Sequence, residues 1–145
     1  GYNYRMTNLQ AALGLAQLEQ LENFILTKKT NYKLYKKEIE KIEGLMLLPF
    51  GTNIRANYWF YSLYLKNNNK SRDELIQYFA DNAIQTRPIW GLINEQKPYA
   101  KNIAYKIEKA ADYRSRVINL PCSSNLTANE VMRVVKCLKE LFGRF

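Results

Sequence analysis

Residues 58–66 read YWFYSLYLK, and this stretch decides the fold. Side chains alternate between the two faces of a strand, so one face would carry four of these residues and the other face three. The first face would hold Trp59, Tyr61, Leu63 and Leu65, and the second Tyr58, Phe60 and Tyr64. Because both faces are apolar and rich in aromatic side chains, the stretch predicts a strand in the centre of a sheet.

Three shorter strands are predicted around this one. They cover Leu45 to Leu48, Ala83 to Arg87 and Val117 to Leu120. A proline follows each of them, at positions 49, 88 and 121, and a proline nitrogen cannot donate to a sheet. We therefore expect each strand to stop there, and the last to be a brief edge strand.

A long helix is predicted in front of the sheet, from Asn8 to about Ile42, because apolar side chains recur there every three or four residues. Thr7 and Gln10 fit a capping box at its start, and Gly44 can end it in the left-handed conformation. A straight helix of this length is longer than a small domain is wide. We therefore expect a bend near Thr27.

Two further capping boxes predict two later helices. Ser71 with Glu74 opens a helix to about Asp81, and Thr127 with Glu130 opens the last helix of the chain. In each box the hydroxyl accepts a hydrogen bond from the third helical amide, and the glutamate reaches back to the cap amide.

Together these elements predict an α+β fold, in which the long helix precedes a small antiparallel or mixed sheet with helices on one face. Less regular segments are a tight connection at residues 67–69, a turn of helix from Pro98 and a short helix ending near Arg114. We divide the chain into residues 1–42, an interface motif with the long helix, and residues 43–145, a small α+β domain.

The composition is that of a globular protein, since 47% of the 145 residues are hydrophobic and 24% are charged. No apolar run approaches the roughly 18 residues of a membrane span, so we expect a cytoplasmic protein without a membrane partner. The net charge is +9. Because the lysines of the long helix are interleaved with glutamates, as is typical of a solvated face, we do not expect a nucleic-acid partner.

Few side chains could carry acid, base or metal chemistry. The chain has no histidine, which excludes His-based metal sites and histidine-assisted nucleophiles. Cys122 and Cys137 lack the spacing of a metal or redox motif, so we expect two free thiols and no metal site. Neighbouring acidic residues such as Asp73 and Glu74 do not face each other on a helix and cannot form an acid/base pair.

A motif at the start of the chain carries a family resemblance. Residues 1–12 read GYNYRMTNLQAA, and Gln17, Leu18 and Leu21 follow. This pattern resembles the signature of the DegT/DnrJ-type sugar aminotransferases, which use pyridoxal phosphate. Two later segments agree with it. Residues 86–90, TRPIW, are similar to the family's late substrate-side loop, and residues 119–121, NLP, are similar to its closing segment.

The resemblance covers essentially the whole chain in the right order, and it implies the small C-terminal domain of a fold type I pyridoxal phosphate enzyme. Asn3 and Arg5 would bind the cofactor phosphate, and Tyr4 would lie beside them near the substrate. A guanidinium and an amide suit a phosphate dianion. From local physics alone, Asn3 caps a turn and Arg5 is a surface cation.

In the second segment, the resemblance implies that Arg87 and Trp90 approach a sugar nucleotide, with Tyr99 nearby. The alternative is that Trp90 and Tyr99 only pack the loop onto the sheet. The family often has proline and histidine where Leu92 and Asn94 stand in this sequence. The loss of an imidazole removes a titratable donor from the substrate side.

The activity that the resemblance implies is transfer of an amino group from an amino-acid donor such as glutamate to a nucleotide-linked keto-deoxysugar, by a homodimer. In that family the Schiff-base lysine precedes the opening motif. We therefore expect a C-terminal fragment that holds no catalytic residue and is inactive alone. Two alternatives remain open. One is a basic module that binds RNA or single-stranded DNA through the strand at Tyr58 to Tyr64; the other is a structural domain that oligomerises through the helix from Leu9 to Ile25.

Overall fold

The computed structural model describes residues 4–66 and 70–143, so the connection expected at residues 67–69 lies outside the described residues. The elements in chain order are α1 (Asn8–Glu19), α2 (Leu21–Ile39), β1 (Leu45–Leu47), β2 (Tyr61–Leu65), α3 (Arg72–Asp81), β3 (Arg87–Pro88), the short 3-10 helix η1 (Ile93–Glu95), α4 (Glu108–Arg116), β4 (Val117–Leu120) and α5 (Ala128–Phe142). The strands form one antiparallel sheet in the order β1-β2-β4-β3. The predicted α+β class is confirmed.

Strand β2 lies in the interior of the sheet, as its sequence predicts. Leu65 pairs with Leu45 of β1, and Tyr61 pairs with Leu120 of β4. The strand begins only at Tyr61, because Tyr58 has a φ of 55° and interrupts the extended backbone. The prediction that Trp59 shares a strand face with Tyr61 is therefore wrong. Its side chain does not join Tyr61 in the core but is 61% exposed.

The last strand, β4, is not the edge strand that the sequence suggests. It pairs with β2 on one side and with β3 on the other, and all four of its residues are buried. The strand expected at Ala83 to Arg87 is instead only Arg87–Pro88. The reason is that Ala83 and Ile84 donate their amides to the last turn of α3, at Ala80 and Phe79.

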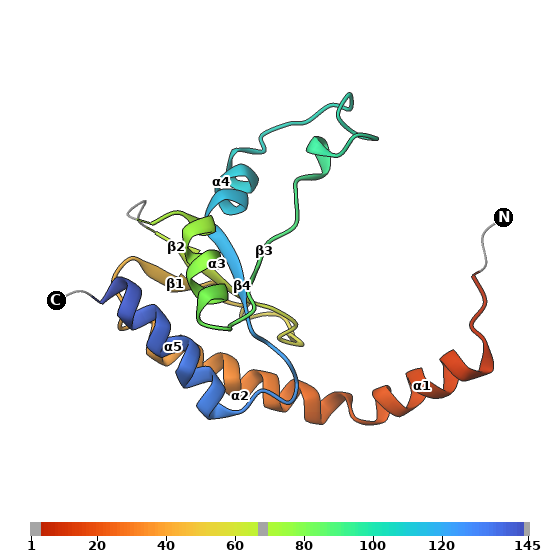
Figure 1. The fold of residues 1–145 in the computed structure, drawn as a ribbon. Helices are drawn as coiled ribbons and strands as arrows, with labels where there is room; N and C mark the ends of the chain where they lie inside the picture. The colour runs from red at the N-terminus through yellow and green to blue at the C-terminus, as the bar shows by residue number, and fades with distance from the viewer. Residues whose placement is uncertain (1–3, 67–69, 144–145) are drawn as a thin grey trace.

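Helices α2, α3 and α5 cover one face of the sheet and enclose the core (Figure 1). The fully enclosed side chains of this core include Tyr35, Ile39, Tyr61, Leu63, Leu75, Phe79, Ile118, Val131, Val135 and Leu138. Helix α4 lies against the other face, where Asp112 accepts a hydrogen bond from Tyr64 at 2.8 Å. The division of the chain at residue 42 stays a prediction, and the core takes side chains from both sides of it.

All three predicted capping boxes are present, at Thr7, Ser71 and Thr127. The expected bend near Thr27 is wrong, since α2 runs through that residue without interruption. The long helix breaks at Gln20, whose amide bonds to Gln17 at 3.2 Å and tightens the turn. Beyond the break, α1 has no buried residue and extends away from the sheet (Figure 1).

The segment between β3 and α4 forms a long excursion away from the sheet (Figure 1). The turn of helix expected from Pro98 is absent, and residues 97–102 form hydrogen-bonded turns and a bend instead. A single 3-10 turn, η1, lies earlier, within the expected loop. None of the helices in the described ranges is long and apolar enough to cross a membrane.

A buried carboxylate joins α2 to α5. Glu38 is 8% exposed and accepts hydrogen bonds from Lys41 at 2.6 Å and from Lys139 at 2.9 Å. These two ammonium groups lower the pKa of Glu38 from 4.5 to about 2. The carboxylate is therefore ionised at neutral and mildly acidic pH.

This ion pair predicts how stability depends on pH. Because the folded-state pKa lies below the unfolded value, the contribution of Glu38 is complete above pH 4.5 and is lost as the pH falls toward 2. Urea unfolding of the chain at several pH values between about 7 and about 3 should show a smaller loss of stability for Glu38→Gln than for the natural sequence. Glu40→Gln, which removes an exposed carboxylate 3.7 Å from Lys36, is the control and should follow the natural sequence. If the free energy of unfolding fell equally with pH in Glu38→Gln and in the natural sequence, the stabilising role of the Glu38 ion pair would be contradicted.

Candidate functional site

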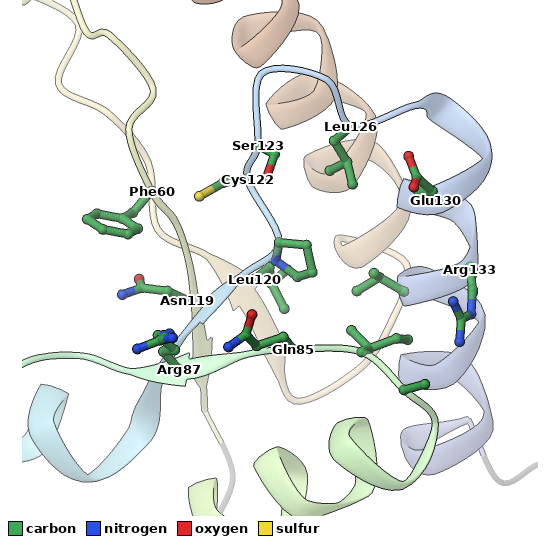
Figure 2. A pocket seen from close by; sticks show the side chains of 14 residues that line it. Phe60, Gln85, Arg87, Asn119, Leu120, Cys122, Ser123, Leu126, Glu130 and Arg133 are labelled. Carbon is green, nitrogen blue, oxygen red and sulfur yellow. The ribbon is translucent and has the colours of Figure 1, made fainter.

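A pocket of about 400 Å³ opens between β3, the segment after β4 and helix α5 (Figure 2). It forms where β3 ends beside β4 and the chain turns into the last helix. Its polar lining residues are Gln85, Arg87, Asn119, Ser123, Glu130 and Arg133, and its apolar walls include Phe60, Leu120, Pro121 and Leu126. Phe60, Arg87 and Asn119 point to one side, whereas Glu130 and Arg133 lie on α5 at the other (Figure 2).

Three aromatic rings meet at the Phe60 end of this pocket, and we call Trp59, Phe60 and Trp90 the aromatic cluster. Trp59 stacks on Phe60, with ring centroids 4.7 Å apart and planes 28° apart. Trp90 packs edge-on against Phe60 at 5.2 Å and lies 6.1 Å from Trp59. Trp59 and Trp90 nevertheless remain 61% and 67% exposed. The cluster is thus an ordered surface of rings rather than part of the core.

Arg87 and Asn119 lie opposite each other in the sheet, as paired residues of β3 and β4. Asn119 is 8% exposed, and its amide oxygen accepts a hydrogen bond from the Ser62 hydroxyl at 2.9 Å. Arg87 is exposed and makes no ion pair with any residue in the described ranges. At this pocket the sheet therefore presents a fixed amide and a cation that has no carboxylate partner among the described residues.

Lys28 of α2 connects the two segments that carry the pocket walls. Its ammonium donates to the backbone carbonyls of Trp59, at 3.4 Å, and of Cys122, and it lies 6.0 Å from the centre of the Tyr61 ring. The Tyr61 hydroxyl donates in return to the Lys28 carbonyl at 2.8 Å. Lys28 therefore links the residues just before β2 to the segment after β4.

The ionisable groups of the pocket do not favour proton transfer. The Glu130 carboxylate accepts hydrogen bonds from the Thr127 amide and hydroxyl, each at 2.7 Å, and the backbone contact in particular lowers the pKa of Glu130. Burial raises the pKa of the Cys122 thiol, although Lys28 opposes the shift. The carboxylate is engaged in a helix cap and the thiol is protonated, so the pocket is suited to binding. Within the described residues, no group of three acidic or sulfur side chains could hold a metal ion.

The opening motif lies on a different part of the molecule. Tyr4 is 89% exposed and Arg5 is also exposed, in the segment that leads into α1 at the far end from the sheet (Figure 1). Asn3 lies outside the described residues. The chain by itself therefore does not bring Tyr4 and Arg5 together with Arg87 and Trp90.

Of the substrate-side residues expected from the sequence, Arg87 lines the pocket together with Phe60, and Trp90 packs on Phe60 without lining the pocket itself. Tyr99 is 48% exposed and belongs to the turns of the excursion, where its amide donates to Gln96 at 2.8 Å. The roles expected for Tyr4, Arg5, Arg87, Trp90 and Tyr99 stay predictions. Phe60 and Asn119 were not proposed as site residues, although Asn119 begins the NLP segment.

Most of the aromatic rings that the nucleic-acid-binding alternative would use are not exposed. Tyr61 is fully buried, and Tyr58 packs between Tyr32, at 5.3 Å, and Phe50, at 4.7 Å. Trp59 is the exposed member of the run. A flat row of stacking rings along the strand, as the alternative requires, is therefore not formed.

The fold is that of sugar aminotransferases. The structure of DesI in the presence of its TDP-sugar product matches with a TM-score of 0.90 and 19% identity, covering 99% of this chain and 38% of DesI. DesV from S. venezuelae matches with a TM-score of 0.88 and 19% identity, covering 100% of this chain and 39% of DesV. At this identity the likeness establishes the fold.

Sequence comparison establishes the family. The model of the DegT/DnrJ/EryC1/StrS aminotransferase family matches residues 1–139, and the chain belongs to that family, as its motifs predict. GDP-perosamine synthase from Escherichia coli O157:H7 is 34% identical over 143 residues, which cover 99% of this chain and 38% of the relative. The chain thus spans less than two-fifths of the length of this relative. Aminotransferases of this family use pyridoxal phosphate.

Proposed function

We propose that this chain is the C-terminal portion of a pyridoxal phosphate enzyme that transfers an amino group from an amino-acid donor, such as glutamate, to a nucleotide-linked keto-deoxysugar. The observation that carries the proposal is the family match over residues 1–139, in which Arg5 of the first signature segment and Arg87 and Trp90 of the second are exposed. Neither Arg5 nor Arg87 contributes to the core. Binding residues commonly lie at the surface, outside the core that holds a fold together.

The chemistry around Arg5 fits the phosphate of the cofactor. The guanidinium lies two residues before the Thr7 cap of α1, and the start of a helix carries a partial positive charge that favours a phosphate group. Arg5, and Asn3 before it, would hold the phosphate and so orient the cofactor, while Tyr4 would form part of the adjoining wall. Bound pyridoxal phosphate would carry the amino group and would supply the electron sink for its transfer.

The exposed start of the chain supports a homodimer. The apolar side chains exposed along residues 4–26 are Met6, Leu9, Leu13, Leu15, Leu18, Leu21 and Leu26. A surface of this extent is typical of a protein interface. In our proposal it packs against the remainder of the polypeptide and a second subunit, and Arg87 and Trp90 face the substrate from the small domain. The Schiff-base lysine lies in the part of the polypeptide before this chain, so the chain alone is inactive.

The test is an amination assay on the complete natural polypeptide that contains this chain. We expect the enzyme, supplied with pyridoxal phosphate and glutamate, to convert a GDP- or dTDP-linked keto-deoxysugar into the amino sugar, detected by mass spectrometry. Reactions without glutamate, and reactions with the 145-residue chain alone, are the controls and should give no product. An enzyme that binds the cofactor but aminates neither class of nucleotide sugar would refute the proposal.

A further inference from the structure

We infer that Glu95 of η1 and Arg114 of α4 form an ion pair when the excursion closes onto α4, and that both are positioning residues for the loop that begins at Trp90. The excursion leaves the sheet after β3, passes through η1 and returns to the sheet along α4 (Figure 1). The ion pair itself is independent of the proposed function, whereas its effect on catalysis rests on that function.

A second pocket, of about 290 Å³, lies between η1, α4 and the start of α3. It shares no lining residue with the pocket at Phe60 and Arg87. The excursion forms one of its walls, so a movement of η1 toward α4 would close it. Its lining includes Leu92 and Glu95 from the excursion, Ala111 and Arg114 from α4, and Arg72 and Asp73 from the start of α3.

The charged side chains that line this second pocket divide into a formed ion pair and two unpaired groups. The Arg72 guanidinium donates to the Asp73 carboxylate at 2.8 Å and also donates to the backbone carbonyl of Arg114. Arg114 and Glu95 make no ion pair with any residue in the described ranges. One cation and one carboxylate are therefore left, on two different walls of the pocket.

The Arg114 guanidinium lacks a partner that a buried donor requires. Its Nε atom is buried and has no hydrogen-bond partner among the described residues. Such a donor is destabilising until it finds an acceptor. Arg72 has no acceptor atom in its guanidinium, and the Asp73 carboxylate is bound to Arg72. The exposed Glu95 carboxylate is thus the charged acceptor of this pocket that is available to Arg114.

Closure of the second pocket would hold the loop between Trp90 and η1 at both ends. Trp90, at one end, already packs edge-on against Phe60 at 5.2 Å. The Glu95 carboxylate on Arg114 would fix the other end. Leu92 and Ala111 line the same pocket, so closure also removes apolar surface from water. A loop held at both ends has less conformational freedom to lose when a ligand binds beside it.

Hydrogen exchange of the complete natural polypeptide, followed by mass spectrometry, tests the ion pair. Glu95→Gln and Arg114→Gln each remove one charge, and we expect each to speed amide exchange in residues 92–96 about two- to fivefold. The double variant should exchange no faster than either single variant, because both changes remove the same interaction. Charge reversal, with Glu95→Arg and Arg114→Glu in one chain, should restore slow exchange.

Glu108→Gln is the matched control, because it removes an exposed carboxylate from the first turn of α4, outside the pocket. Exchange in residues 92–96 should not change in this variant. Since Glu95 is exposed, Glu95→Gln tests the pair even where Arg114→Gln does not fold. Unchanged exchange in Glu95→Gln, or effects that add in the double variant, would overturn the inference. Charge reversal that leaves exchange fast would also overturn it, since Arg114 would then pair with a group outside this chain.

The positioning role is tested by kinetics of the same variants. In Glu95→Gln we expect KM for the nucleotide sugar to rise about two- to fivefold with kcat unchanged, and charge reversal to restore KM. Faster exchange with an unchanged KM would overturn this role. Normal amination with unchanged exchange in Glu95→Gln refutes the ion pair and leaves the proposed function standing. Faster exchange in a polypeptide that aminates no nucleotide sugar refutes the function and supports the ion pair.

Discussion

Arg87→Leu is expected to lower kcat/KM of the complete enzyme for its nucleotide sugar by about 10- to 100-fold, because a charge-assisted hydrogen bond contributes roughly 1.5–3 kcal/mol. Arg87 is exposed on β3, opposite Asn119, and no described carboxylate neutralises it. We expect most of the loss to appear as a higher KM, since the phosphates are bound alike in the ground state and the transition state. Steady-state kinetics with the amino donor held at saturation measures the effect.

Two controls show whether the loss comes from the charge. Arg87→Lys keeps the cation but not the two-pronged guanidinium, so its kcat/KM should lie between those of Arg87→Leu and the natural enzyme. KM for glutamate in the first half-reaction should be nearly the same in all three proteins. A normal KM for the nucleotide sugar in Arg87→Leu would show that Arg87 does not contact the phosphates.

Phe79→Ala is expected to destabilise the chain by about 3–5 kcal/mol, the usual cost of removing a buried phenyl ring. Phe79 is fully buried on α3, where it belongs to the core with Leu75 and the sheet. Single domains are stable by only about 5–15 kcal/mol, so the variant should melt roughly 10 °C lower or more. Urea unfolding followed by circular dichroism measures the change.

The matched control is Leu9→Ala, which also shortens an apolar side chain on a helix. Leu9 is 81% exposed on α1, a helix without buried residues, so the free energy of unfolding should change by less than about 0.5 kcal/mol. In the complete enzyme the same change should instead weaken the interface that we propose for α1. A loss below about 1 kcal/mol in Phe79→Ala would mean that α3 does not close the core.

The helix starts could be predicted because their determinants are local. In each capping box the two partners are three residues apart, and the hydrogen bonds between Thr7 and Gln10, for example, form without help from the rest of the chain. The central strand could also be predicted. Alternation places Tyr61, Leu63 and Leu65 on one face of it, whichever strands lie beside it.

The predictions that were wrong concern long-range choices. Nothing within Val117 to Leu120 shows that Arg87 and Pro88 will pair outside it and place it inside the sheet. The long helix breaks at Gln20 and not, as predicted, near Thr27. No glycine or proline at Gln20 indicates this break in the sequence. The break separates α1, which has no buried residue, from α2, whose buried residues begin at Asn31.

The site residues also divide into those that the sequence predicted and those that only the structure revealed. The motif around residues 86–90 indicated Arg87 and Trp90, and the family match over residues 1–139 confirmed the class of protein to which that motif belongs. The contribution of Phe60 and Asn119 followed only from the tertiary structure. Ser62 and Asn119 are 57 positions apart, yet their side chains meet at 2.9 Å because β2 and β4 are neighbours.

The sequence by itself determined the family, the α+β class, the capped helix starts and the interior strand β2, since each depends on side chains a few positions apart. Only the tertiary structure decided the strand order, the break at Gln20 and the meeting of the aromatic cluster with Arg87 and Asn119. The physical reason is that a capping hydrogen bond or an alternating strand is complete within its own segment. A strand's neighbours and a pocket's walls depend on which distant segments bury the most apolar surface together.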